Sequence, residues 1–237
     1  MTRSTRLLLA LSLVSLAGCS SAMTVGGMTP ATQSPSSVQL HDAMRKLWSD
    51  HVVWTRLYII AAAANDASAS TAAARLMRNQ EDVGNAIVPY YGAAAGAKLT
   101  DLLKQHISIA VDLVAAAKAG DNAKVADADR RWHANANDLA TFLSGANPNW
   151  PKNDVVDLLS VHLKLTKDEA VARLAGKWDD DVSAFDDIFT EIMTVSDTLA
   201  DGIVKQFPDR FVTVAIPATA TAATQRRGLA RVFSRGR

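Results

Sequence analysis

The stretch Leu47-Trp48-Ser49-Asp50-His51-Val52-Val53-Trp54-Thr55 sets the pattern on which the rest of the chain is built. It places a histidine one helical turn after a leucine, so the two side chains share one face of a helix. The pattern returns in weaker form around His106, in residues 102–110, and around His162, in residues 158–166. The sequence therefore predicts three helices that each present a histidine to a helical core.

The composition favours an all-α fold. Apolar residues make up 49% of the 237 residues while aromatic residues make up only 6%, because much of the apolar content is alanine. Alanine is the strongest helix former, and the β-branched and aromatic residues that favour strands are scarce. A chain of this length can also bury a sizeable core.

Turn signals divide the predicted helices into three hairpins. Gly120-Asp121 is typical of a tight corner between two helices, and Pro148, Pro151 and Pro208 each end a helix. The pattern at residues 166–169 resembles a capping box and predicts a new, bent helical segment there. We expect about six helices in a bundle domain of residues 38–211. The first four should cover residues 38–64, 72–88, 93–119 and 122–143. The fifth should start near residue 152 and break near residue 166, and the last should cover residues 177–206.

The first 19 residues resemble a bacterial lipoprotein signal peptide. Arg3 and Arg6 precede an apolar run of ten residues, which is too short to span a bilayer as a mature helix. The run ends in Leu16-Ala17-Gly18-Cys19, and Cys19 is the only cysteine of the chain. The resemblance implies that Cys19 is acylated, as by palmitate, and becomes the first residue of the mature protein. Ser20, in place of aspartate, favours the periplasmic face of an outer membrane.

Both ends of the mature chain differ in composition from the bundle. Residues 20–37 are rich in Ser, Thr, Gly and Pro and predict a flexible tether. Residues 218–237 hold five arginines and no acid, so residues 212–237 read as a basic, disordered tail. The first 19 and last 20 residues together hold 7 basic groups, which leaves 25 − 7 = 18 against 24 acids in between, a net charge near −6. An acidic body argues against nucleic-acid binding.

An Asn/Asp pair accompanies the histidine in the first two hairpins. Asn79 and Asp82 have the same spacing as Asn135 and Asp138, and the aspartates follow His51 and His106 by 31 and 32 residues. In the third hairpin the nearest match is Ser196-Asp197, 35 residues after His162. We interpret the pattern as a triplicated helical hairpin.

Three interpretations of these residues stay open; the third, catalysis, would need a pocket that is lined by the histidines and open to solvent. In the first, the histidines form a buried polar network with Asn79 and Asn135, because a core imidazole must satisfy its N–H group. In the second, a transition metal or small ligand is held by His51, His106, His162, Asp82 and Asp138. The chain has no Glu-x-x-His, His-Glu-x-x-His, Gly-x-Ser-x-Gly or phosphate-loop motif, so no enzyme class is indicated.

Several motifs of residues 47–211 resemble a bacterial family of small, often exported, all-helical proteins of unassigned function. They are Arg78-Asn79-Gln80 with Asp82, Gly84-Asn85-Ala86-Ile87 with Pro89-Tyr90-Tyr91-Gly92, Asn147-Pro148-Asn149-Trp150-Pro151, and Lys205-Gln206-Phe207-Pro208. The resemblance implies a helical domain and brings no activity or cofactor. We therefore expect a lipid-anchored binding or structural module of the cell envelope, attached to a membrane by its acyl chains.

Overall fold

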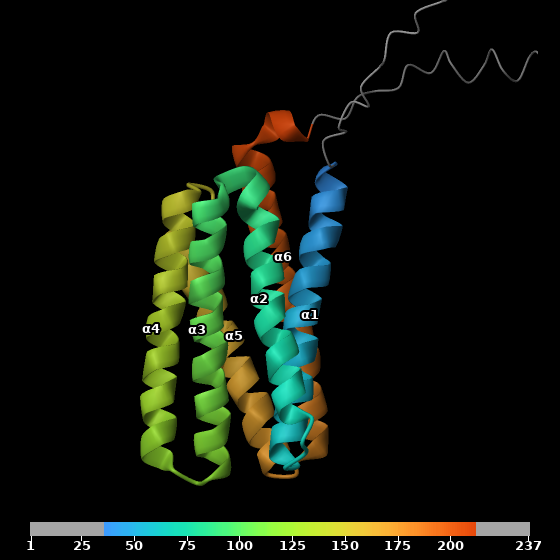
Figure 1. Ribbon diagram of the computed structural model, residues 1–237, viewed down its shortest axis with the longest axis vertical. Coiled ribbons are helices and arrows are strands. Elements are labelled where there is room, and N and C mark those ends of the chain that lie inside the picture. The colour runs from blue at the N-terminus through green and yellow to red at the C-terminus, as the bar shows by residue number, and fades with distance from the viewer. Residues whose placement is uncertain (1–35, 212–237) are drawn as a thin grey trace, which may run out of the picture. The chain divides into compact units, whose positions relative to one another are not determined.

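The computed structural model describes residues 36–211, which form six α-helices running alternately up and down (Figure 1). This confirms the predicted all-α bundle, and the described residues contain no strand. The predicted signal peptide, most of the tether and the basic tail lie outside the described residues. The helices are α1 (Ser37–Ala63), α2 (Ala69–Tyr91), α3 (Ala93–Lys118), α4 (Asn122–Ala146), α5 (Lys152–Leu174) and α6 (Trp178–Gln206), followed by the short 3-10 helix η1 (Pro208–Arg210).

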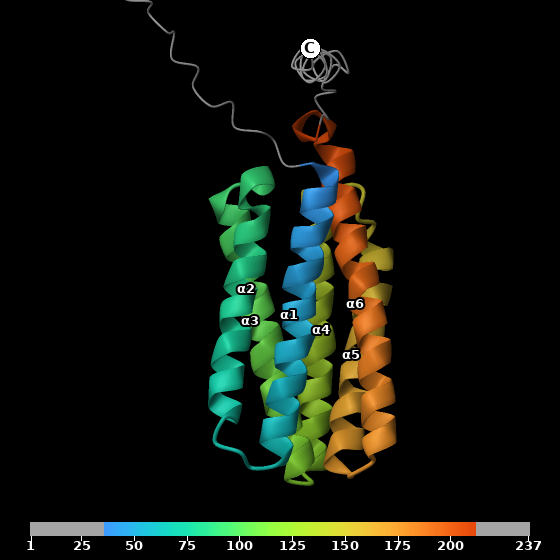
Figure 2. The ribbon, with the colours of Figure 1, turned by 90° about the vertical axis from the view of Figure 1, so that its right-hand side faces the viewer.

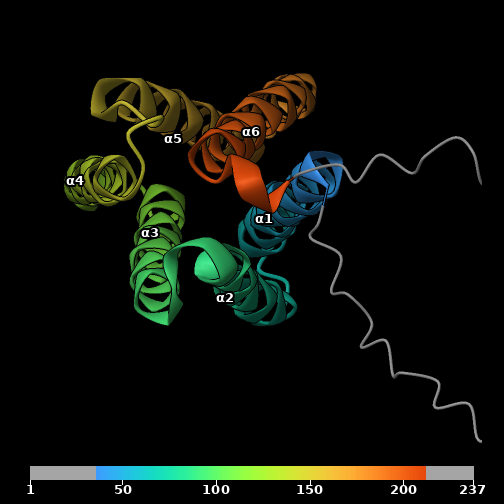
Figure 3. The same cartoon turned by 90° about the horizontal axis from the view of Figure 1, so that it is seen from above.

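The six helices form a closed ring. Each helix packs against the next one along the chain, and α6 returns to pack against α1 (Figure 3). The first helices of the three hairpins, α1, α3 and α5, also contact one another across the ring. These are the helices that carry the three predicted core histidines, so the topology brings the histidines towards one another.

The three hairpins turn in the same way. Each first helix has an alanine as its C-cap residue, followed by a residue with positive φ, which is Asn65 (57°), Gly120 (69°) or Gly176 (68°). In every case this residue follows the histidine of its helix by 14 positions. The next N–H then donates to the carbonyl five residues back, in the Schellman pattern, as Asp66 to Ala61, Asp121 to Ala116 and Lys177 to Ala172. The equal count from histidine to corner supports three related hairpins.

Two helix boundaries differ from the prediction. Helix α2 continues through Pro89 to Tyr91, since a proline in the last turn removes only one helical hydrogen bond, and Gly92 with φ of 83° ends it. Helix α5 is continuous through Thr166, so the predicted break is wrong. The side chains of Thr166 and Glu169 are buried in the core instead of capping a new helix.

Small residues allow close helix packing at two places. A Cβ atom on Gly84 of α2 would lie 2.7 Å from the carbonyl oxygen of Gly96 in α3, so the two backbones touch there. A Cβ atom on Gly202 of α6 would lie 1.9 Å from Nε1 of Trp150, whose ring fills the space above that glycine. Among the described helices, none has a stretch long and apolar enough to cross a membrane.

Candidate functional site

The three histidines meet in the core, as the sequence predicts. His51 on α1, His106 on α3 and His162 on α5 are each at most 5% exposed. The ring of His162 lies between the other two, with its centroid 5.7 Å from that of His51 and 6.4 Å from that of His106. The first helix of every hairpin therefore contributes one imidazole to a single layer of the bundle.

Each imidazole has a polar partner from the second helix of its own hairpin. Nδ1 of His51 lies 3.3 Å from Nε2 of Gln80, and Nδ1 of His106 lies 3.0 Å from Oδ1 of Asn135. Nδ1 of His162 lies 2.9 Å from Oε2 of Glu191. All three partners follow their histidine by 29 residues. This constant spacing is a second measure of the triplication, and it assigns the partner that the third hairpin appeared to lack.

The hydrogen bonds of His106 fix its tautomer. Asn135 donates from Nδ2 to the carbonyl of Leu102 at 3.1 Å, so its Oδ1 is free to accept the Nδ1–H of His106. The indole Nε1–H of Trp132 then donates to Nε2 of His106 at 3.1 Å. Both ring nitrogens are thus used when His106 is neutral. Burial, followed by the nearby His162, lowers the pKa of His106 to about 3, which keeps the ring in this form.

A chain of amides orients His51. Asn79 donates from Nδ2 to the carbonyl of Leu47 at 3.0 Å, which leaves its Oδ1 to accept from Nε2 of Gln80 at 3.1 Å. Nε2 of Gln80 also lies 2.9 Å from the carbonyl of Leu76 and 3.3 Å from Nδ1 of His51, so its two protons are shared among three acceptors. An amide nitrogen does not accept hydrogen bonds. Nδ1 of His51 therefore accepts, and the proton of the neutral ring sits on Nε2. Burial and the two other histidines lower the pKa of His51 well below its usual value.

A small cavity of about 20 Å³ lies against the histidine layer. It is lined by all three imidazoles, by Trp132 and by Thr166, whose buried Oγ1 has no hydrogen-bond partner among the described residues. The volume of this cavity is enough for one water molecule, although its lining is mostly apolar.

The predicted aspartates do not join the histidines. Asp82 is 50% exposed and lies 3.7 Å from Arg75, and Asp138 is exposed on α4. Asn79 and Asn135, the two predicted network residues, are buried and hydrogen-bonded as described above. Sequence reasoning missed Gln80, Glu191 and Trp132, although the 29-residue spacing would have found the first two.

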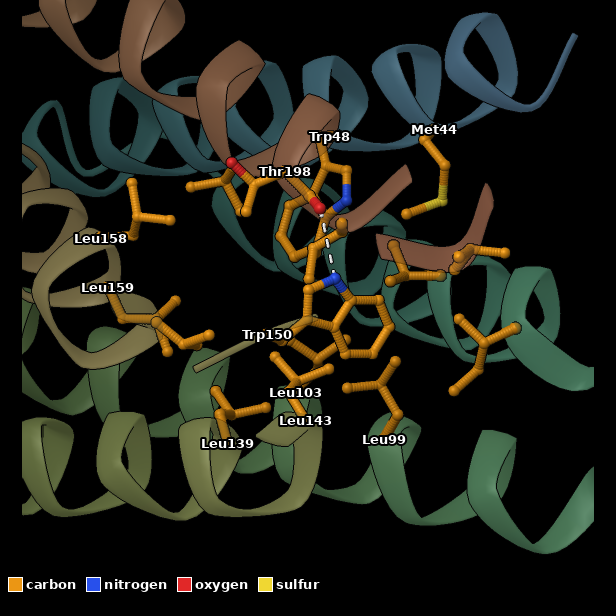
Figure 4. A pocket seen from close by; sticks show the side chains of 16 residues that line it. Met44, Trp48, Leu99, Leu103, Leu139, Leu143, Trp150, Leu158, Leu159 and Thr198 are labelled. Atoms are coloured by element: carbon orange, nitrogen blue, oxygen red, sulfur yellow. Dashed lines mark hydrogen bonds between the residues drawn. The ribbon is translucent and has the colours of Figure 1, made fainter. Parts of the chain in front are cut away.

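An apolar cavity of about 40 Å³ occupies the bundle next to the histidine layer (Figure 4). Seven leucine side chains from α3, α4, α5 and α6 line it, together with Met44, the rings of Trp48 and Trp150 and other mostly apolar residues. Trp150 donates its Nε1–H to the carbonyl of Thr198 at 3.2 Å. Nε1 of Trp48 is buried and has no partner among the described residues. The ring of Trp48 also packs edge-on against His51, with centroids 5.6 Å apart, so it separates the two cavities.

A second buried polar cluster joins α1, α5 and α6. Nη1 of Arg56 donates to Oε1 of Glu169 at 2.6 Å and to Oδ1 of Asp181 at 2.9 Å. Nη1 of Arg173 donates to Asp181 at 3.1 Å, and both carboxylates are only 1% exposed. Burial raises the pKa of Glu169 to about 7, although Arg56 pulls it in the opposite direction. The two arginines balance the two acids, so this cluster ties three helices together.

The hydrogen bonds of the histidine layer engage ring nitrogens that a metal ion would need. A neutral His51 carries its proton on Nε2, and Nε2 of His106 already accepts from Trp132, whereas a metal needs an unprotonated, unshared lone pair. Within residues 36–211 no three His, Cys, Asp or Glu side chains are placed to hold one metal ion. The described side chains of this layer are joined by hydrogen bonds.

Comparison with known proteins found no match to a family model, to a curated protein or to a solved structure. The family resemblance noted from the sequence motifs therefore stays a prediction.

Proposed function

We propose that this protein is a lipid-anchored module of the cell envelope that binds or spaces other components and does not catalyse a reaction. The anchor is Cys19, which follows Leu16-Ala17-Gly18 at the end of the apolar leader. Two or more acyl chains on one residue give stable membrane attachment. The periplasmic face of an outer membrane is the proposed location.

The observation that carries the non-catalytic role is the engagement of the core histidines. A general base or nucleophile-activating imidazole has to reach a substrate. The imidazoles are at most 5% exposed, and their Nδ1 atoms bond to Gln80, Asn135 and Glu191 in the second helices of the hairpins. Such bonds fix the register of each hairpin, which supports a scaffold whose outer surfaces do the binding.

A metal-binding role is the second candidate. The ring centroid of His162 lies 5.7 Å from that of His51 and 6.4 Å from that of His106, and outer partners hold the Nδ1 atoms, as in many histidine metal sites. Elemental analysis of the purified chain carrying Cys19→Ser, after exposure to Zn²⁺ and dialysis, separates the two roles. The scaffold role predicts sub-stoichiometric metal in this protein and in a His106→Gln variant. One equivalent of zinc, lost in His106→Gln but kept in the exposed-site control His133→Gln, would replace it with the metal role.

The anchor has its own test. Cells expressing the full chain are fractionated alongside cells expressing Cys19→Ala, with Ser20→Ala as the matched control. We expect the unaltered chain and Ser20→Ala in the membrane fraction, and Cys19→Ala either in the soluble fraction or with an uncleaved leader. A mature, cleaved Cys19→Ala protein that stays with the membranes would contradict acylation at Cys19.

A further inference from the structure

Helix α6 exposes an apolar stripe near its start. Trp178, Val182, Phe185 and Phe189 follow one another at intervals of four, three and four residues, so they share one face of the helix. Trp178 is 58% exposed, Val182 53% and Phe189 38%. The rings of Phe185 and Phe189 contact each other, with centroids 6.2 Å apart.

The neighbouring helix α1 extends this apolar surface. Figure 2 shows α1 beside α6, and Val53 and Leu57 of α1 are 38% and 43% exposed. Arg56, between them in the sequence, places its guanidinium 4.7 Å above the ring of Phe185. The exposed residues of α1 therefore border the stripe of α6. We call this surface the α1–α6 face; it consists of Val53, Leu57, Trp178, Val182, Phe185 and Phe189.

Free carboxylates border the α1–α6 face. Asp179 and Asp186 each follow a residue of the stripe by one position, which places them about 100° round the helix from it. Asp187 lies two positions from Phe185 and from Phe189, about 160° round the helix from the stripe. All three are exposed, and none forms an ion pair with a residue of the range 36–211. An apolar stripe bordered by unpaired acids is complementary to an amphipathic helix with basic edges.

The C-terminal segment of the same chain has this complementary pattern. In residues 225–237, Leu229, Val232 and Phe233 have the i, i+3, i+4 spacing of one helical face. The same residues hold Arg226, Arg227, Arg231, Arg235 and Arg237 and no acid. We propose that residues 225–237 fold as a basic amphipathic helix on the α1–α6 face of their own chain. A segment that cannot fold alone can order on such a surface.

The connecting chain is long enough for this docking. Phe211 follows Phe189 by 22 positions, of which residues 190–206 belong to α6, so the two are separated by roughly 30 Å at the helical rise of 1.5 Å per residue. The 17 residues 212–228 span about 23 Å as a flexible coil and at most about 56 Å when extended. The segment can therefore reach the face within one molecule, where linkage gives it a millimolar effective concentration.

Cysteine cross-linking tests the contact in the mature chain with Cys19→Ser. The test protein adds Ser183→Cys, beside the stripe, and Ser234→Cys, beside Phe233. The matched control replaces Ser183→Cys with Ala134→Cys, an exposed position of α4. We expect the intramolecular disulfide to form about tenfold faster in the test protein. That advantage in rate should disappear in two variants, one with Phe233→Ser and one with Asp179, Asp186 and Asp187 all changed to Asn. It should also disappear at about 1 M salt, where charges are screened within about 3 Å.

Three results would overturn the proposal. Equal cross-linking rates in test and control proteins would show that the segment does not select this face. Predominantly intermolecular disulfides that increase with protein concentration would mean that the face is covered by a second copy. Loss of the preference on adding phosphatidylglycerol vesicles, but not phosphatidylcholine vesicles, would assign the segment to a membrane surface. Unchanged circular dichroism spectra must accompany each rate, so that a misfolded variant is not counted.

Discussion

His106 should make the protein acid-sensitive, and the single substitution His106→Gln should remove the contribution of that residue. Its ring is neutral in the folded state because burial lowers its pKa to about 3. In the unfolded chain a histidine has a pKa of about 6.5. Below pH 6.5 the unfolded state therefore binds more protons than the folded state, so His106 favours unfolding increasingly as the pH falls from 6.5 towards 3.

The size of the effect follows from these two values. Each pH unit between them changes the free energy of unfolding by about 1.4 kcal/mol. At pH 5, about 1.5 units below the unfolded value, His106 should have lowered the stability by about 2 kcal/mol relative to pH 7. Glu169 acts in the opposite direction, because its raised pKa of about 7 lets the folded state take up a proton first as the pH falls. Its contribution is common to variants of His106 and cancels in their comparison.

His106→Gln is the informative variant. A glutamine can accept from Trp132 through its oxygen and donate to Asn135 through its amide, but it does not titrate. Urea unfolding of the Cys19→Ser protein with and without His106→Gln, at pH 7 and pH 5, gives the four free energies required. We expect the wild-type advantage over His106→Gln to shrink by about 2 kcal/mol between pH 7 and pH 5. An unchanged difference, or the same shrinkage in the surface variant His133→Gln, would refute the reasoning.

Two further substitutions test packing and the buried charges by thermal or urea unfolding. Gly202→Ala places a Cβ atom 1.9 Å from Nε1 of Trp150 and should lower the free energy of unfolding by about 1–3 kcal/mol. The control Gly145→Ala, with no atom within 4 Å of its new Cβ, should not lower it. Equal stabilities of the two variants would contradict the packing. Arg56→Met leaves two buried carboxylates short of a cation and should lower the free energy of unfolding by about 3–5 kcal/mol. The control Arg130→Met, at an exposed ion pair, should lower it by less than about 1 kcal/mol. A loss below about 1 kcal/mol for Arg56→Met would show that the cluster is not coupled to folding.

Much of the fold was accessible from the sequence because its signals are local. Alanine content, helical spacing and the corner at Gly120-Asp121 indicated helical hairpins, and the three leucine–histidine stretches indicated the core faces of α1, α3 and α5. The errors arose where a local pattern competes with packing. The capping-box residues at 166–169 lie inside α5 because Thr166 and Glu169 are buried by neighbouring helices, which a local motif does not report.

The partners of the histidines were harder to predict, because they depend on the register between two helices. Asp82 was chosen for its spacing from Asn79, yet it precedes the buried Val83 by one residue and so points about 100° away from it. Glu191 was missed because its side chain differs from the amides of Gln80 and Asn135, although its position in the hairpin is equivalent. Only the corner geometry fixes which residue of the second helix faces the histidine.

His51 and His106 are the two core histidines that the hydrogen-bond network of the hairpins should hold in one neutral tautomer. Long-range ¹H–¹⁵N correlation spectra of the folded protein, labelled at histidine, report the tautomer of each ring directly. We predict the Nε2–H form for His51 and the Nδ1–H form for His106, both unchanged between pH 7 and pH 5. Rings that average between tautomers, or that titrate near pH 6.5 while the protein stays folded, would contradict the account.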